Sequence, residues 1–218
     1  MNIKLNTEIL EVEENKSIIE LFNKEIGENK KIIACDINNE IKSLNFIPKE
    51  NDNVNFVDVT SRDGRRTYIR GLLFIMSMAF NKCYPEAFLS VNYQLTNAMY
   101  CEVDNLEVTK EMIEHVKHKM NEIVNKNIEI KKVEMTKEEA IKFYEKEKTL
   151  RGILQLDNEQ KKGVSLYFCE DYYNYFYGVM PIDTSYINVF DIIPYNDGFL
   201  LRYPDKENPE VLEPGLVS

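Results

Sequence analysis

The hydrophobic and polar positions of the first sixty residues form strand-like runs on both sides of one helix-like run. Strand-like alternation occurs in three stretches, the first of which holds two short strands: residues 3–12, 32–36 and 54–59. Ser17 and Glu20 have the spacing of a capping box, which opens a helix that ends before Gly27. Turn signals separate the later strands at residues 38–39 and 51–53. This ββαββ order predicts a small β-grasp (ubiquitin-like) unit over residues 1–60.

Three helix-like stretches follow in the rest of the chain. A dense apolar run predicts a helix over residues 68–82 that is buried on most faces. Thr109 is the predicted cap of a second helix over residues 109–126, and the apolar face of this helix consists of Ile113, Val116, Met120, Ile123 and Val124. Thr136 and Glu139 form another capping box, which opens a third helix over residues 136–148.

Strand-like runs alternate with these helices. They occupy residues 88–103 as two strands that turn near residues 96–97, then 128–135, 152–157, 164–169, an aromatic run to 177, 186–193 and 199–203. The mixture predicts an α+β domain over residues 61–204. A Pro- and acid-rich stretch over residues 205–218 is interpreted as a linker.

The aromatic run over residues 167–177 places seven rings in eleven positions. That density exceeds what one buried strand needs, so it indicates a lined cavity or an interface. The run contains no His, and its single Cys, Cys169, has no second metal ligand nearby. No catalytic residue is therefore predicted in it.

Composition limits the classes of function. A chain of 218 residues with 44% hydrophobic content can form a substantial core, and two units are expected. The four cysteines are far apart, which favours reduced thiols over a disulfide framework. No signal peptide or membrane span is found in the sequence, so we expect a cytoplasmic protein without membrane contact.

The net charge of −10 is unevenly distributed, and residues 1–60 carry 7 basic against 12 acidic groups. Extended binding of RNA or DNA is disfavoured by this balance. Four of the six arginines nevertheless fall within nine residues: Arg62, Arg65, Arg66 and Arg70. Two interpretations stay open, a local anion site and an arginine-bearing hairpin turn on the surface around Asp63 and Gly64.

Familiar catalytic patterns do not occur in the sequence. His115 and His118 are three residues apart on a charged helix, but no third metal ligand accompanies them, and exposed helix positions are expected. No nucleophile elbow and no phosphate-binding loop is present. The chain alone is therefore not expected to hold ATP and Mg²⁺ through a phosphate-binding loop.

The order of elements and two motifs, residues 57–70 and 106–114, resemble the N-terminal half of threonyl-tRNA synthetase. Residues 128–144 are similar to the strand-then-helix stretch of that family. The resemblance implies a TGS domain, which is a β-grasp unit, followed by the second additional domain of the threonyl- and alanyl-tRNA synthetases. It covers nearly the whole chain.

The resemblance also implies where metal ligands would stand. The family's H-x-x-x-H pair falls on Arg70 and Phe74, and its C-x-x-x-H pair falls on Phe176 and Met180, so all four ligand positions are replaced. Neither a phenyl ring nor this thioether supplies the donors that a hydrolytic divalent ion needs. Metal-dependent hydrolysis, including removal of mischarged amino acids from tRNA, is therefore expected to be lost.

A TGS domain with a metal-free second domain is also similar to the N-terminal region of a bacterial uridine kinase-like nucleoside kinase. Residues 84–91, 99–102 and 174–178 carry that likeness. It implies an accessory or regulatory module whose partner is a C-terminal kinase domain, with ATP and Mg²⁺ bound only there. Two alternatives stay open: an aminoacyl-tRNA editing or threonyl-tRNA-synthetase-related protein, and an RNA- or ribosome-facing TGS protein.

Seven residues are predicted to form a cleft that binds a small ligand or docks another domain. Arg70 is the predicted partner of an anion or carboxylate, and Tyr93 is a polar edge. The apolar wall consists of Phe74, Tyr175, Phe176, Tyr177 and Met180. For Phe74, Phe176 and Met180, the competing interpretation is that they fill the volume of the lost metal site as core residues.

Overall fold

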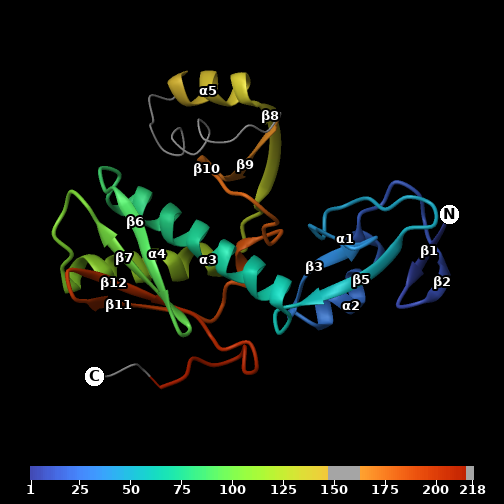
Figure 1. Cartoon of the computed structure of the whole chain (residues 1–218), viewed down its shortest axis with the longest axis horizontal. Coiled ribbons are helices and arrows are strands. Elements are labelled where there is room, and N and C mark those ends of the chain that lie inside the picture. The colour runs from blue at the N-terminus through green and yellow to red at the C-terminus, as the bar shows by residue number, and fades with distance from the viewer. Residues whose placement is uncertain (147–162, 215–218) are drawn as a thin grey trace.

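The computed structural model describes residues 1–146 and 163–214 and contains two α+β units. The units lie side by side along the longest axis of the molecule, and the long helix α3 (Arg62–Cys83) begins at the first unit and crosses the second (Figure 1). One cluster of buried hydrophobic residues extends through both units. The predicted α+β fold class is confirmed.

The first unit is a five-stranded mixed sheet with the strand order β2-β1-β5-β3-β4. Its strands are β1 (Asn2–Leu5), β2 (Glu8–Glu11), β3 (Ile32–Ile37), β4 (Glu40–Lys42) and β5 (Asn53–Asp58). β1 runs parallel to β5, while the other pairs are antiparallel. The short helices α1 (Ile18–Leu21) and α2 (Asn23–Glu28) bury Ile18 and Ile26 completely in the core. This arrangement is the predicted β-grasp.

The local signals of the first unit are confirmed in most details. Ser17 Oγ accepts from the Glu20 amide at 3.3 Å, and Glu20 Oε1 accepts from the Ser17 amide, which closes the predicted capping box. The single predicted helix is divided into two, since α1, which the capping box opens, ends at Leu21, and α2 continues through Gly27 to Glu28, beyond the expected end. The sequence interpretation also missed β4, a strand of three residues at the edge of the sheet that pairs with β3.

The start of α3 corrects two predictions. The helix begins at Arg62, six residues before the predicted start, because Ser61 Oγ caps it by accepting from the Gly64 amide at 3.0 Å. Asp63 and Gly64 therefore belong to the first helical turn, and the hairpin interpretation is wrong. A Cβ on Gly64 would lie 1.8 Å from the Asp58 carbonyl oxygen, so glycine lets the helix start directly against the end of β5.

The second unit contains a four-stranded antiparallel sheet with the order β11-β12-β7-β6. Its strands are β6 (Leu89–Leu95), β7 (Ala98–Val103), β11 (Asp191–Tyr195) and β12 (Gly198–Arg202). Helix α3 packs on this sheet through Phe80, whose ring stacks on Phe199 at 5.4 Å between centroids. Helix α4 (Lys110–Asn125) buries all five residues of its predicted apolar face.

A smaller sheet with the order β10-β9-β8 stands beside α3. Its strands are β8 (Lys131–Thr136), β9 (Gly163–Cys169) and β10 (Tyr172–Tyr175), and α5 (Lys137–Lys146) packs Ala140 against Val164 and Leu166. The Thr136 capping box is confirmed. The aromatic run leaves its strand after Tyr175. The predicted strand over residues 186–193 is largely wrong, because its start belongs to a 3₁₀ turn, η1 (Thr184–Tyr186), and β11 begins only at Asp191. The strand predicted over residues 152–157 lies outside the described residues.

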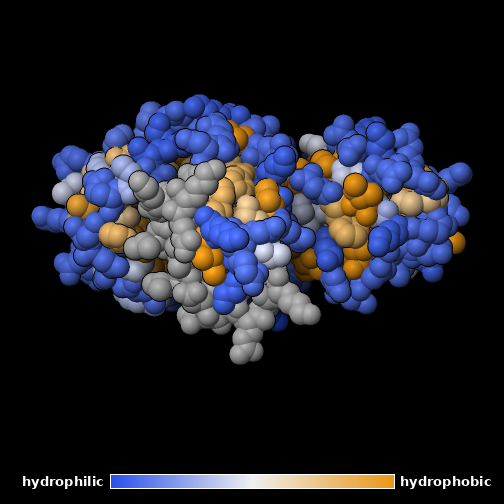
Figure 2. All heavy atoms as spheres, turned by 90° about the horizontal axis from the view of Figure 1, so that it is seen from above, coloured by the Kyte–Doolittle hydropathy of each residue, from blue (hydrophilic) through white to orange (hydrophobic). Residues whose placement is uncertain are grey.

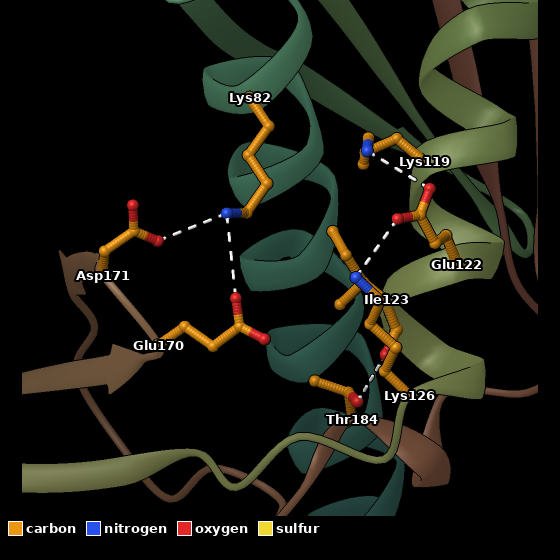
Figure 3. Close-up of polar contacts among 8 residues, drawn as sticks. All are labelled: Lys82, Lys119, Glu122, Ile123, Lys126, Glu170, Asp171 and Thr184. Atoms are coloured by element: carbon orange, nitrogen blue, oxygen red, sulfur yellow. Dashed lines mark hydrogen bonds and ion pairs between the residues drawn. The ribbon is translucent and has the colours of Figure 1, made fainter.

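Polar contacts tie these segments to the two long helices (Figure 3). Lys82, near the end of α3, pairs with Asp171 at 3.2 Å and with Glu170 at 4.0 Å in the β9–β10 turn. Thr184 Oγ1 donates to the Ile123 carbonyl of α4 at 2.8 Å. The aromatic segment is therefore anchored to α3 at one end and to α4 at the other.

The surface in Figure 2 is mostly hydrophilic, with a few hydrophobic residues showing in each unit. Among the described residues, no helix combines the length and the apolar content that crossing a bilayer requires. The four cysteines are free thiols. Burial raises the pKa of Cys169 to about 12, which keeps this thiol in its unreactive protonated form.

Candidate functional site

Helix α3 carries the four clustered arginines along one side. Arg62, Arg66 and Arg70 recur every four residues, and Arg65 follows Arg62 by three, so a helix that begins at Arg62 places all four on neighbouring positions of its surface. All four line one cleft of about 880 Å³. We call it the arginine cleft; its other walls are the β6–β7 turn, residues 205–206 and Phe176.

Five cationic side chains and one carboxylate line the arginine cleft. The cations are Arg62, Arg65, Arg66, Arg70 and Lys206. The carboxylate is Asp205, which already accepts hydrogen bonds from the Asn97 side chain at 3.1 Å and from the Glu207 amide at 2.9 Å. These bonds hold its pKa below the usual range, so it stays ionised near neutral pH. The cleft remains strongly cationic.

Two of the arginines are fixed in place. Arg65 Nη2 donates to Asn97 Oδ1 at 2.5 Å, and its guanidinium lies 5.3 Å from the centre of the Tyr203 ring. Arg70 Nη1 donates to the Val179 carbonyl. Burial lowers the pKa of Arg70, but a guanidinium stays charged at physiological pH.

Arg62 and Arg66 are exposed at the mouth of the cleft. Within residues 1–146 and 163–214, neither has an ion pair or a side-chain hydrogen bond. They are therefore available to an anionic ligand. The sequence analysis weighed an anion site here but selected only Arg70, because the early start of α3 was not recognised.

The predicted apolar wall is divided between core and cavity. Phe74 is fully buried and makes edge-to-face contacts with Tyr172 at 5.2 Å and with Phe176 at 5.8 Å between ring centroids. It lines neither this cleft nor the second cavity described next. Met180 is also buried, with 2% of its surface exposed. Packing of Phe74 thus agrees with the competing interpretation of a core residue.

A second cavity, of about 610 Å³, lies between the two units, and we call it the inter-unit cavity. Residues 41–45 of the first unit form one side, and residues 129–132 and 175–180 of the second unit form the other. Tyr175, Phe176, Tyr177 and Met180 line it together. The sequence analysis missed its cations, Lys42, Lys131 and Lys132, because they are spread over both units.

Phe176 lines both cavities, so the segment that carries it, residues 175–180, separates them. We call this segment the partition. Tyr167 donates from its hydroxyl to the Gly178 carbonyl at 2.6 Å and holds this partition. Gly178 has φ of +110°, and a Cβ there would lie 2.5 Å from Arg70 Cζ. The partition therefore needs glycine at this position, where the chain passes directly over the guanidinium.

Tyr93, the last predicted cleft residue, lies elsewhere. It belongs to β6, is 47% exposed, and packs on the Tyr100 ring at 4.9 Å between centroids. It lines neither the arginine cleft nor the inter-unit cavity. The structure therefore brings Arg70 and Phe176 together in one cleft and three further predicted residues into the other cavity, without Phe74 or Tyr93.

The positions where the resemblance implies metal ligands do not fit a metal ion. The Arg70 guanidinium carries only donors, and the Phe74 ring has no lone pair to offer. Among the described residues, no group of three or more His, Cys, Asp or Glu side chains could hold a metal. His115 instead contacts Tyr84, with 3.4 Å between Nδ1 and the phenol oxygen.

The fold and the cleft define a β-grasp unit joined to an α+β unit that carries a cationic cleft with an apolar wall. No family model matches the chain. A threonine–tRNA ligase of Clostridium kluyveri is 28% identical over 142 residues, which are 64% of this chain and 22% of the ligase. The threonine–tRNA ligase of Clostridium tetani is 33% identical over 115 residues, 52% of this chain and 18% of the ligase.

A longer match is to a probable cytoplasmic threonine–tRNA ligase of Enterocytozoon bieneusi, 24% identical over 180 residues. These residues are 82% of this chain and 28% of that protein. The chain thus spans about a fifth of the length of the first relatives that it matches. It is similar to threonyl-tRNA synthetases, as the resemblance of its motifs implies.

These relatives favour one of the alternatives over the leading sequence interpretation. They are all threonine–tRNA ligases, and none of those named is a nucleoside kinase. The threonyl-tRNA-synthetase-like assignment is therefore supported, and the uridine kinase assignment is not. A following kinase domain, with its ATP and Mg²⁺, stays a prediction.

Proposed function

We propose that this chain is a binding module of a threonyl-tRNA-synthetase-related protein, and that it engages the acceptor end of tRNA without hydrolysing the aminoacyl ester. The observation that carries this proposal is the composition of the cleft. Four arginines line it, and two of the positions at which the resemblance implies metal ligands belong to it, one occupied by Arg70 itself and the other by the apolar side chain of Phe176. Such a site attracts a polyanion, and within the described residues it has no group of side chains that could hold a metal ion to activate water.

The relatives support tRNA as the ligand, since each is named a threonine–tRNA ligase. The ligase activity itself does not follow from the similarity, because the matched part is about a fifth of those enzymes. The net charge of −10 also argues against a long RNA footprint. Contact limited to the terminal nucleotides at the arginine cleft reconciles an acidic protein with a tRNA ligand.

Two assays test the proposal with the 218-residue chain. In the first, threonyl-tRNA and seryl-tRNA are incubated with the protein, with and without added zinc. Deacylation is expected to proceed at the rate of the protein-free control. Faster release that depends on zinc would show that the site still catalyses hydrolysis and would overturn the non-hydrolytic assignment.

In the second assay, binding of threonine tRNA is measured with an intact acceptor end and with the terminal nucleotides removed. The intact tRNA is expected to bind more tightly, and its affinity is expected to fall as salt rises, because cationic side chains carry the interaction. Equal affinity for the two forms would refute recognition of the acceptor end.

A further inference from the structure

We propose that the side of the four-stranded sheet that faces away from α3 is a docking surface for a basic protein segment. Arginine or lysine side chains of that segment would lie across a row of tyrosine rings and pair with carboxylates beside them. We call this side the tyrosine face, after Tyr93, Tyr100 and Tyr195. The inference goes beyond the proposed function, because none of these rings lines the arginine cleft and the partner belongs to a different class.

The register of the strands fixes which side chains share the tyrosine face. Phe199 stacks on Phe80 of α3, so the next residue, Leu200, points to the opposite side of the sheet. Leu200 pairs with Tyr100, which pairs with Tyr93, and directly paired residues point to the same side. Tyr100 and Leu200 are buried, yet neither belongs to the hydrophobic cluster that contains Phe199 and Phe80. The tyrosine face is therefore a surface separate from the core.

An irregularity in β6 turns Tyr93 toward this face. Val91 pairs with Cys101 and Tyr93 pairs with Tyr100, so Asn92 between them has no register partner in β7. In a regular strand, Tyr93 would point to the same side as Val91, which is the side of Cys101 and α3. The extra residue reverses that alternation, as bulges at sheet edges do when they redirect a side chain. The backbone thus places an aromatic ring on the open side of an edge strand.

The three rings form a continuous aromatic surface. The Tyr93 and Tyr100 rings are 4.9 Å apart, and the Tyr100 and Tyr195 rings are 5.9 Å apart, between centroids. Tyr195 reaches Tyr100 from another strand because it pairs with Gly198, which has no side chain to stand between them. Tyr100 is covered, whereas Tyr93 is 47% exposed and Tyr195 is partly exposed. The two outer rings are accessible to a partner.

Two carboxylates give the tyrosine face a negative edge. Glu102 accepts a hydrogen bond from the Tyr100 hydroxyl at 2.8 Å, and this bond, burial and the charges of Glu102 and Asp197 raise the pKa of Tyr100 to about 12. Within residues 1–146 and 163–214, neither carboxylate has an ion pair. Arg202 lies on the same side but at the far end of β12 from Asp197, and its guanidinium donates to the Glu213 carbonyl.

This combination of rings and carboxylates selects a cationic partner. The face of an aromatic ring attracts a guanidinium or ammonium group, and a neighbouring carboxylate adds an ion pair to the same group. A nucleic acid would bring its phosphates against the two carboxylates, and a second copy of this chain would bring carboxylates of its own. A basic protein segment satisfies both parts of the surface.

Nuclear magnetic resonance with the ¹⁵N-labelled chain tests the proposal. The probe is a short peptide of alternating glycine and arginine, and the peptide of alternating glycine and glutamate is its control. The arginine peptide is expected to shift amide signals mainly in residues 90–102 and 193–198, with an affinity that falls as salt rises. No binding at millimolar peptide concentration, or shifts centred on another part of the molecule, would overturn the proposal.

Variants separate the rings from simple attraction by net charge. Tyr93→Leu is expected to weaken binding of the arginine peptide about threefold, the size of one exposed cation–π contact, while Tyr93→Phe keeps the ring and should bind as the unchanged chain does. Glu102→Gln combined with Asp197→Asn is expected to weaken it at least about threefold. Glu8→Gln combined with Glu11→Gln is the matched control, because it removes the same charge at exposed positions of β2.

Circular dichroism establishes that each variant is folded before it is titrated. Equal weakening by the two double variants would show that net charge alone attracts the peptide, and unchanged binding by Tyr93→Leu would show that the rings take no part. Either result refutes the proposal.

Two further measurements distinguish the other occupants and the proposed function. A dimer in sedimentation experiments that Tyr93→Leu dissociates, or an oligonucleotide that shifts the same amide signals, would assign the tyrosine face to another partner and refute the basic segment. Binding of tRNA is expected to be unchanged in Tyr93→Leu, because that ring does not line the arginine cleft. Failure of tRNA to bind the unchanged chain would refute the proposed function and leave the docking surface standing.

Discussion

Replacing Phe74 by alanine tests whether the metal-ligand position of the resemblance has become part of the core. Its ring is fully buried between α3 and β10 and touches two other rings edge to face, at 5.2 Å from Tyr172 and 5.8 Å from Phe176. Phe74→Ala removes both contacts and leaves a void that the anchored β9–β10 turn cannot close easily. A residue that merely lined an open cleft would leave no such void.

The expected loss follows from burial. Truncation of a buried phenylalanine to alanine costs about 3–5 kcal/mol, and each lost edge-to-face contact accounts for roughly 0.5–1.5 kcal/mol of it. Domains are stable by about 5–15 kcal/mol, so the loss is a large fraction of the total. At about 2–4 °C per kcal/mol for a chain of this size, the melting temperature is expected to fall by roughly 6–20 °C.

Thermal melting followed by circular dichroism measures this loss. Phe88→Ala is the matched control, because that ring is 62% exposed and its removal is expected to change stability by no more than about 0.5 kcal/mol. The reasoning would be refuted if the two variants melted at the same temperature. Phe74 would then contribute no more packing than a surface residue.

Two further predictions concern the partition between the cavities. Gly178→Ala places a methyl group 2.5 Å from Arg70 Cζ at φ of +110°, so denaturation should show a loss of about 1–3 kcal/mol. Gly27→Ala, whose new methyl would meet nothing within 4 Å, should be neutral or slightly stabilising, and equal losses would contradict the close approach. Burial raises the pKa of Tyr167 and Tyr186 from 10 to about 12, so the folded state keeps protons that the unfolded chain loses. The stability that these two protonated phenols contribute is therefore full below pH 10 and is lost as pH rises toward 12. When the protein is titrated with base and tyrosinate absorbance is followed, a fraction of the tyrosines should ionise late, and that fraction should shrink in Tyr167→Phe.

The sequence alone determined the features that depend on neighbours along the chain. The caps at Ser17, Thr109 and Thr136 are confirmed, since each side chain reaches a backbone amide within one turn. The buried face of α4 is confirmed for the same reason, because helical spacing alone selects which side chains share a face. The β-grasp also follows from the order of its strand and helix signals.

The tertiary structure decided how these elements meet. Ser61 could have been recognised as a cap, but the contact between Gly64 and the Asp58 carbonyl depends on where β5 ends in space. The alternation of β6 identifies two faces but not which of them is covered, so Tyr93 was assigned to a cleft although it lies half exposed on the Tyr100 ring.

The cleft itself has the same origin. Arg65 and Asn97 are 32 positions apart, and Arg70 and Val179 are 109 apart, yet their contacts fix the cationic wall. The aromatic run predicted a lined cavity, but whether a ring faces that cavity or the core depends on the surfaces that α3 and the small sheet present to it. Local patterns specify the side chains, and only packing between distant segments assigns Phe74 to the core and the arginines to an open cleft.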